Sequence, residues 1–271
     1  MDKILSQLVE ISNAFDTDKI KLIIIGGVAT YFRALQSKQP ARTTHDIDLC
    51  LPESEISIAD RRLIVSSVLI DTLLYKNPEG KGDFRLTRAD GSNLDVLCPS
   101  VEGVEEIGGQ LVLIADKLHG FQADGLAFIE EGLVAVKHVN IQFYIPSVIN
   151  HLILKLNAFY SNNTARAIAE NESALHKYNR AIVHALDICT IVKGASTDDF
   201  VEANRLVKKY NMHKVIREAI TIIKVSFLEP EDAGWHLLLD SGDFLPEIAA
   251  KKKLVEVELL TDRLKQLFLI V

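Results

Sequence analysis

The sequence predicts an α+β fold, in which a mixed-sheet core with flanking helices over residues 1–145 precedes a mainly helical C-terminal lobe over residues 146–271. Short apolar runs of β-type spacing fill the first part, whereas apolar residues recur at helical spacing from Pro146 onward. The charge is also uneven, because residues 1–145 carry 14 basic and 21 acidic side chains and residues 146–271 carry 16 of each. Both changes at the same position indicate two lobes.

Length and composition exclude several classes of protein. With 271 residues and 48% hydrophobic side chains, the chain can bury a core, which excludes global disorder. The net charge of −7 excludes a protein that coats nucleic acid with a uniformly basic surface. The N-terminus lacks the basic start of a secretory signal, and no apolar run approaches the roughly 18 residues of a membrane span. We therefore expect a cytoplasmic protein with no membrane partner.

The first half alternates helices and strands. Apolar residues from Ile4 to Phe15 recur at helical spacing, and a β-branched run then ends at Gly26-Gly27, where a helix begins. Asp90-Gly91 has the composition of a hairpin turn between two short strands. The expected helices cover residues 4–15, 28–35 and 57–74, and the expected strands cover residues 21–25, 45–51, 83–88, 93–98, 111–114, 133–136 and 139–144.

The second half carries helical signals. Pro146 opens a helix expected over residues 146–160, and a second helix is expected over residues 173–193. Ser196 or Thr197 caps a third helix, because these side chains satisfy backbone N–H groups of a first turn. Two or three further helices are expected beyond it.

Asp46 and Asp48 form the most informative pair of the first half. Residues two apart on a strand point to the same face, so both carboxylates would lie side by side, opposite the buried Ile47 and Leu49. Like charges this close repel unless a cation lies between them, and Mg²⁺ prefers such oxygen ligands. The alternative is solvated surface, since about five acid-x-acid pairs are expected by chance among 37 acids in 271 residues.

Asp95 and a glycine pair add context to these two acids. Asp95 stands among aliphatic residues on another expected strand, where an unpaired charge is costly. If the strands are neighbours, three carboxylates converge, a set that suits two metals about 3.5 to 4 Å apart and an in-line displacement at phosphorus. Gly26-Gly27 lies between a strand and a helix, where backbone N–H groups attract phosphate, although a tight bend is the alternative. The pattern fits neither a Rossmann site nor a P-loop.

Three segments together carry a family resemblance: residues 26–30 (GGVAT), residues 42–48 (RTTHDID) and residues 94–96 (LDV). They resemble the polymerase-β-like nucleotidyltransferase superfamily, whose signature is Gly-Gly or Gly-Ser after a hydrophobic residue, a downstream Asp-x-Asp and a third acid on a later strand. The first two segments look closer still to the AbiEii-type nucleotidyl transferases, the toxin side of some bacterial toxin–antitoxin and phage-defence pairs. Residues 152–158 and 185–188 are similar to that family's lysine-bearing and aspartate-bearing helices, although Val183-His184 stands where the family often has Lys-Asp.

The resemblance implies a metal-dependent transfer of a nucleoside monophosphate from an NTP to an acceptor hydroxyl, with release of pyrophosphate. Asp46 and Asp48 would hold two Mg²⁺ ions, for which Mn²⁺ could substitute, and Asp95 would complete the metal site beside the acceptor. Gly26 and Gly27 would bind the β- and γ-phosphates through their backbone.

Four further residues are candidate nucleotide ligands with open alternatives. Lys155 would neutralise phosphate charge, or it is a surface lysine of an amphipathic helix. Asp187 would hydrogen-bond the nucleotide, accept from Lys155, or pair with another basic neighbour. Arg42 and Thr44 would orient the metal-binding strand or contact the triphosphate, while Arg42 could instead pair with a carboxylate.

The sequence leaves the acceptor open between a tRNA or another RNA end, a protein hydroxyl and a small aminoglycoside-like molecule. Basic residues of the second half form either a strip for RNA or solvated helical faces. These residues are Lys208, Lys209, Lys214, Arg217, Lys224 and residues 251–253. An antitoxin protein is the partner that the family resemblance implies. Two other classes stay open: a catalytically silent nucleotide-binding or regulatory module, and a helical interaction protein.

Overall fold

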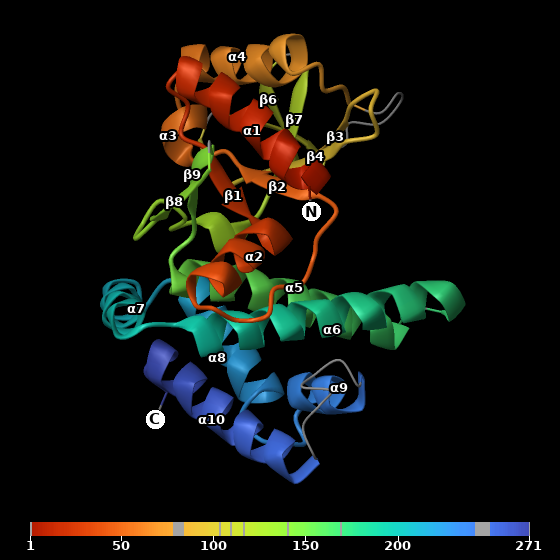
Figure 1. Cartoon of the computed structure of the whole chain (residues 1–271), viewed down its shortest axis with the longest axis vertical. Coiled ribbons are helices and arrows are strands. Elements are labelled where there is room, and N and C mark those ends of the chain that lie inside the picture. The colour runs from red at the N-terminus through yellow and green to blue at the C-terminus, as the bar shows by residue number, and fades with distance from the viewer. Residues whose placement is uncertain are drawn as a thin grey trace. The chain divides into compact units, whose positions relative to one another are not determined.

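The chain divides into two compact units. The structure is a computed structural model that describes residues 2–77, 84–102, 104–108, 110–115, 117–139, 141–168, 170–241 and 250–270. The first unit comprises Met1–Phe32 and Pro40–Pro146, and the second comprises Arg33–Gln39 and Ser147–Val271. The division falls inside α2 (Gly26–Gln36), whose last residues belong with the helical unit. Figure 1 labels the elements of both units.

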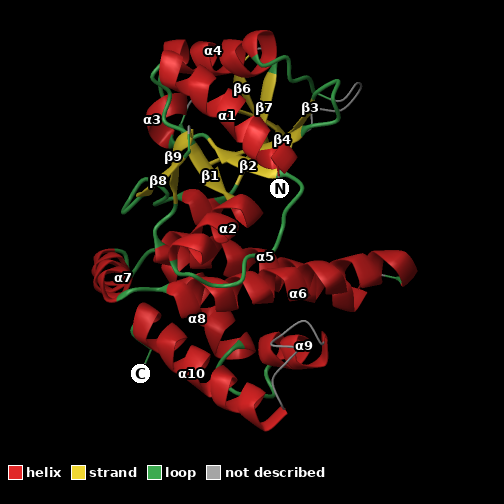
Figure 2. Ribbon diagram, viewed as in Figure 1, coloured by secondary structure: helices red, strands yellow, loops and turns green. Residues whose placement is uncertain are grey.

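The first unit is built on one mixed sheet, drawn in yellow in Figure 2. Within the described residues, nine strands take part in the order β5-β6-β7-β4-β2-β1-β9-β8, with β3 paired to β4 outside this path. The strands are β1 (Ile23–Ile25), β2 (Ile47–Cys50), β3 (Arg85–Thr87), β4 (Asn93–Cys98), β5 (Glu105–Gly108), β6 (Leu111–Ala115), β7 (Leu118–Gln122), β8 (Val134–His138) and β9 (Ile141–Ile145). Strand β2 is antiparallel to β1 and parallel to β4, which makes the sheet mixed, as predicted.

Helices flank this sheet. The predicted apolar stripe of α1 (Asp2–Thr17) is buried in the core, and the helix packs against β9. The remaining helical segments of the unit are α3 (Glu53–Ile56), α4 (Ala59–Ser67), the π-helical turn η1 (Val68–Thr72) and the 3₁₀ turn η2 (Asp124–Leu126). The single helix expected over residues 57–74 is therefore wrong in detail, because the chain changes to the wider π-helical turn after Ser67. Of the expected hairpin, residue 83 lies outside the described residues.

Helices form the described part of the second unit beyond α2. They are α5 (Val148–Ile168), α6 (Asn171–Gly194), α7 (Thr197–Lys209), α8 (Lys214–Ser226), α9 (Ala233–Ser241) and α10 (Ala250–Phe268). The long helices α5 and α6 lie side by side (Figure 1). The ring of Phe227 packs against Phe159 at 4.9 Å and against the fully buried Trp235 at 5.2 Å. The predicted fold class, a mixed-sheet core followed by a helical lobe, is confirmed.

Membrane-spanning helices were not expected from the sequence. In the part of the chain that the structure describes, no helix combines the length and the apolar character needed to cross a bilayer.

Ser196 caps α7, as one of the two predicted candidates. Its Oγ accepts a hydrogen bond from the Asp199 backbone N–H at 3.2 Å, and the Asp199 carboxylate accepts from the Ser196 N–H at 2.8 Å. Because Ser196→Ala leaves an N–H of the first turn without this acceptor, we expect it to lower the free energy of unfolding by about 1 kcal/mol in urea denaturation. Thr221→Ala, within α8, is the control and should change it by less than about 0.5 kcal/mol. Equal losses in the two variants would contradict the capping role.

Candidate active site

Adjacent strands bring the predicted acidic residues into one row. Asp48 on β2 lies opposite Ile25 of β1 on one side and opposite Asp95 of β4 on the other. Arg85 on β3 pairs with Asp95 from the far side of β4. Directly opposed residues of neighbouring strands have their side chains on the same face. The strand expected over residues 45–51 begins only at Ile47, so Asp46 lies in the bend before β2, with its Oδ2 3.7 Å from Nη2 of Arg85. Asp48 and Asp95 therefore share one face of the sheet, and Asp46 is linked to Asp95 through Arg85.

Arg85 is the cation of this cluster, and it was not among the residues predicted from the sequence. Its guanidinium binds Asp95 side-on, with Nε 2.6 Å from Oδ1 and Nη2 2.7 Å from Oδ2. Nη2 also lies 3.7 Å from Oδ2 of Asp46. The hydrogen bond to Asp95 raises the pKa of Arg85 above its ordinary value, and the charges of all three aspartates add to this effect against the opposing effect of burial. The counter-cation expected here was a metal ion, whereas the structure has an arginine.

The start of α2 lies against Asp48. Gly26 follows β1 directly with φ of +66°, a left-handed conformation that favours glycine, and a methyl group on it would lie 1.6 Å from Oδ2 of Asp48. A methyl group on Gly27 would lie 2.7 Å from Oγ1 of Thr44 and 3.4 Å from Nη2 of Arg42. Both glycines thus make room for these side chains. A guanidinium, a hydroxyl and the positive end of a helix meet here, which is an arrangement that binds anions.

The carboxylates differ in exposure and in their availability to a metal. The side chain of Asp46 is 40% exposed, whereas that of Asp95 is only 10% exposed. Three carboxylates fit a divalent cation such as Mg²⁺ in chemistry. In this conformation, however, Arg85 engages both oxygens of Asp95. Among the described residues, no three His, Cys, Asp or Glu side chains are gathered as a metal-holding group in this conformation.

Lys155 and Asp187 lie in the helical unit and pair with each other. Nζ of Lys155 on α5 is 2.7 Å from Oδ2 of Asp187 on α6, and both side chains are buried. The interpretation of Lys155 as a surface lysine is therefore wrong, because Asp187 stabilises its ammonium in the interior. Of the alternatives left open for Asp187, acceptance from Lys155 is present in the structure. Contact of either residue with a nucleotide stays a prediction.

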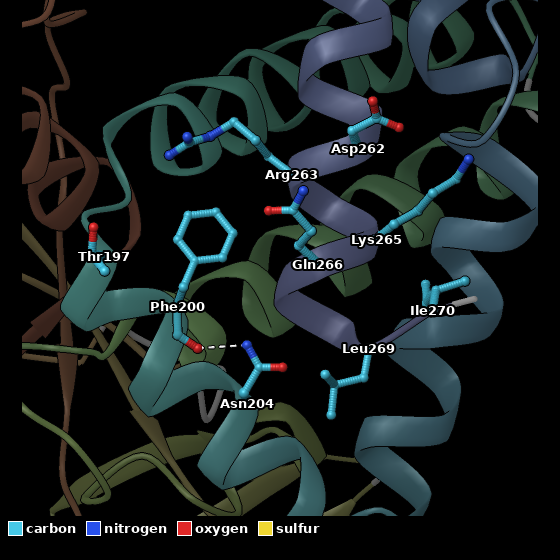
Figure 3. Close-up of a pocket in the computed structure, with 9 residues that line it drawn as sticks. All are labelled: Thr197, Phe200, Asn204, Asp262, Arg263, Lys265, Gln266, Leu269 and Ile270. Carbon is cyan, nitrogen blue, oxygen red and sulfur yellow. Dashed lines mark hydrogen bonds between the residues drawn. The ribbon is translucent and has the colours of Figure 1, made fainter.

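A cavity of about 900 Å³ lies in the helical unit between α7 and α10 (Figure 3). Its lining residues are Thr197, Phe200, Asn204, Asp262, Arg263, Lys265, Gln266, Leu269 and Ile270. No predicted site residue lines it. Arg263 donates to the backbone carbonyls of Val192 and Ala195, and its guanidinium lies 4.9 Å from the centre of the Phe200 ring. This arginine therefore stabilises the helical packing, and the cavity adds nothing to the acidic cluster.

Comparison with known proteins leaves the family open. No protein-family model matches the chain, and no curated protein matches it. The solution structure of the antibiotic-resistance factor ANT(2'')-Ia is similar over 79% of this chain and 100% of its own, with 18% identity and a TM-score of 0.39. The crystal structure of an antigenic nucleotidyltransferase-like protein from Paracoccidioides brasiliensis is similar over 82% of this chain and 94% of its own, with 14% identity and a TM-score of 0.40. Likeness at this level assigns neither a family nor a function.

Proposed function

We propose that this chain is a nucleotidyltransferase that moves a nucleoside monophosphate from an NTP to an acceptor hydroxyl and releases pyrophosphate. The observation that supports the proposal is the pairing of Asp48 with Asp95 across β2 and β4, with Asp48 against Gly26 at the start of α2 and with Thr44 and Arg42 beside Gly27. Asp46 approaches the same pair through Arg85. An NTP requires both parts of this arrangement. Its phosphates need positive charge and N–H donors, and its reaction needs carboxylates that hold cations near the phosphorus.

The proposed reaction is an in-line displacement at the α-phosphorus. The acceptor oxygen forms a bond to this phosphorus, the bond to the pyrophosphate oxygen breaks, and the acceptor's proton passes to Asp95 or to solvent. Asp46, Asp48 and Asp95 would hold two Mg²⁺ or Mn²⁺ ions, which supply charge that stabilises the attacking and leaving oxygens. The backbone at Gly26 and Gly27 would bind the β- and γ-phosphates. Because the chemistry depends mostly on positioning, these contacts would supply much of the rate.

The acceptor and the biological role are finer parts of the proposal. The acceptor proposed is an RNA end, such as that of tRNA, or a protein hydroxyl, and the basic residues of the helical lobe favour the RNA end. The motif resemblance supports a toxin role with an antitoxin partner. Five basic side chains of α7 and α8 are exposed, of which Lys214 pairs with Glu218: Lys208, Lys209, Lys214, Arg217 and Lys224. Incubation of the protein with α-phosphate-labelled NTPs, total RNA and lysate tests for transfer. Label in one fraction would identify the acceptor class, and label in none would count against transfer.

The test of the site is isothermal titration of each NTP with and without Mg²⁺. We expect Mg²⁺-dependent binding in the wild-type chain, weakened by about tenfold or more in Asp46→Asn and Asp48→Asn, because each substitution removes a carboxylate that would hold the cations. Asp71→Asn removes an exposed carboxylate outside the site and is the matched control, with binding unchanged.

Two outcomes of this titration would overturn the proposal. Binding that is independent of Mg²⁺ and of Asp46 and Asp48 would favour the nucleotide-binding module. No binding of any NTP would favour the helical interaction protein.

A further inference from the structure

Arg85 contacts the acidic cluster through two of its members. It donates from Nε to Oδ1 of Asp95 at 2.6 Å and from Nη2 to Oδ2 of the same carboxylate at 2.7 Å. The same Nη2 lies 3.7 Å from Oδ2 of Asp46. A side-on guanidinium pair of this kind fixes the orientation of the carboxylate. The rotamer of Asp95 in this structure is therefore set by Arg85.

The charge of the cluster explains why an arginine stands there. Asp48 and Asp95 are directly paired across two strands, and Asp46 lies close to the same guanidinium. Three carboxylates gathered without a cation would repel one another, and the buried Asp95 would lack compensation for its lost hydration. A guanidinium is always charged and less hydrated than an ammonium, so it suits this half-buried position. Arg85 thus balances the acids in the chain without metal.

The two carboxylate oxygens of Asp95 that Arg85 binds are also ligands that a divalent cation would use. Mg²⁺ and Mn²⁺ bind carboxylate oxygens at short range. The guanidinium of Arg85 takes one lone pair on each oxygen of Asp95 and holds its positive charge within 2.7 Å of both, which repels a second cation. Occupation by the metal and by Arg85 are therefore alternatives at Asp95. The side chain of Arg85 is 40% exposed, so it has room to swing into solvent once Asp95 is released.

We propose that Arg85 is the internal counter-cation of the acidic site and competes with the divalent cation for Asp95, so that metal binding requires Arg85 to release this carboxylate. The inference rests on the proposed function, because it presumes that the three acids bind metal. It makes Arg85 a positioning residue, which acts on the metal site through Asp95. When the free concentration of the divalent cation is too low to displace Arg85, Asp95 stays bound to Arg85. The site then lacks Asp95 as its third metal ligand.

The test is isothermal titration of Mn²⁺ alone, without nucleotide, into the wild-type chain and Arg85→Gln. We expect Arg85→Gln to bind Mn²⁺ about tenfold more tightly, because loss of the charged double hydrogen bond releases Asp95 to the metal. Arg85→Lys should give a smaller gain, since an ammonium cannot hold both carboxylate oxygens side-on. Arg88→Gln is the matched control on the same hairpin, because Arg88 pairs with Glu10 and Asp90 instead.

Thermal unfolding supplies a second readout that a purely structural arginine would not give. Without metal, Arg85→Gln should unfold at a lower temperature than the wild type, because its carboxylates lose their cation. Added Mn²⁺ should then raise its midpoint by more than it raises that of the wild type. If Arg85→Gln does not fold without metal, Arg85→Lys gives the same comparison with a charge retained.

The outcomes separate this inference from the proposed function. Metal binding by the wild type with equal or weaker binding by both Arg85 variants would overturn the inference and leave the proposed function standing. No Mn²⁺ binding by the wild type or by any variant would overturn the proposed function and the inference with it. A gain of affinity in Arg88→Gln equal to that in Arg85→Gln would also overturn the inference, because the effect would then be one of net charge.

Discussion

Gly26→Ala is expected to abolish Mg²⁺-dependent NTP binding. The added methyl group would lie 1.6 Å from Oδ2 of Asp48, far inside any contact distance between unbonded atoms, so the carboxylate must leave its place or β1 must separate from β2. Either movement separates the acids from the start of α2. We expect a loss of affinity of about a hundredfold or more by isothermal titration. The left-handed backbone at φ of +66° adds a loss of about 1–2 kcal/mol in the free energy of unfolding, because alanine is strained there.

Gly132→Ala is the matched control for this prediction. Gly132 has the same φ of 66° but is exposed, on the turn before β8. We therefore expect the same loss of stability in urea denaturation from the backbone strain, with NTP binding unchanged. Binding by Gly26→Ala at the wild-type level would mean that Asp48 is not part of the nucleotide site, and equal loss of binding in both variants would assign the effect to stability alone.

The acidic row was predictable because its signals are local. Period-two alternation predicts the face of Asp48, and the aliphatic neighbours of Asp95 mark a buried strand. The same alternation was extended to Asp46, which the structure has in the bend before β2. The glycine pair marks the turn from β1 into α2. Together these signals specify the types of element and the face of each side chain. The pairing of β2 with β4, which brings the acids together, had to be assumed.

The position of Arg85 opposite Asp95 was also predictable from the sequence. A hairpin that turns at Asp90 pairs residues at equal distance on either side, and this pairing places Arg85 opposite Asp95. The motif comprises only carboxylates and glycines, and the balancing charge was therefore assigned to a metal. A basic residue on a neighbouring strand also balances a buried acid, and the hairpin register places Arg85 in that position.

Strands β5 and β7 were not predicted, and for β7 the reason is a glycine. Gly120 interrupts the apolar alternation of β7, and glycine normally weakens a strand prediction. A methyl group on Gly120 would lie 2.5 Å from Cδ1 of Ile114, so the glycine leaves room for the Ile114 side chain in its present position against β7. The residue that obscures the strand in the sequence is thus the one that allows it to pack. Only the tertiary contact resolves this conflict.

The partner of Lys155 depends on a contact that periodicity does not specify. Helical spacing gives the face of α5 on which the lysine lies, but Asp187 comes from α6, after an intervening turn. A lysine flanked by Leu154 and Leu156 is therefore equally compatible with a solvated stem and with a buried pair. The packing of α5 against α6 decides between them, and it makes the pair a structural feature of the helical unit.

Lys155→Met is accordingly expected to lower the free energy of unfolding by about 3–5 kcal/mol, because it leaves the buried carboxylate of Asp187 without its cation. Urea denaturation measures this loss. In the double variant Lys155→Met with Asp187→Leu, both charges are gone and apolar side chains fill the space, so most of the stability should return.

Lys193→Met is the matched control, since Lys193 on α6 pairs with Glu256 at 2.5 Å while its side chain is 47% exposed. Solvent screens an exposed pair, so its loss should change the free energy of unfolding by less than about 1 kcal/mol. If Lys155→Met also lowers the free energy of unfolding by less than about 1 kcal/mol, solvent reaches Lys155 as well. The lysine would then be available to a phosphate. A large loss confined to Lys155→Met, with recovery in the double variant, would identify the pair as an internal support of the helical unit.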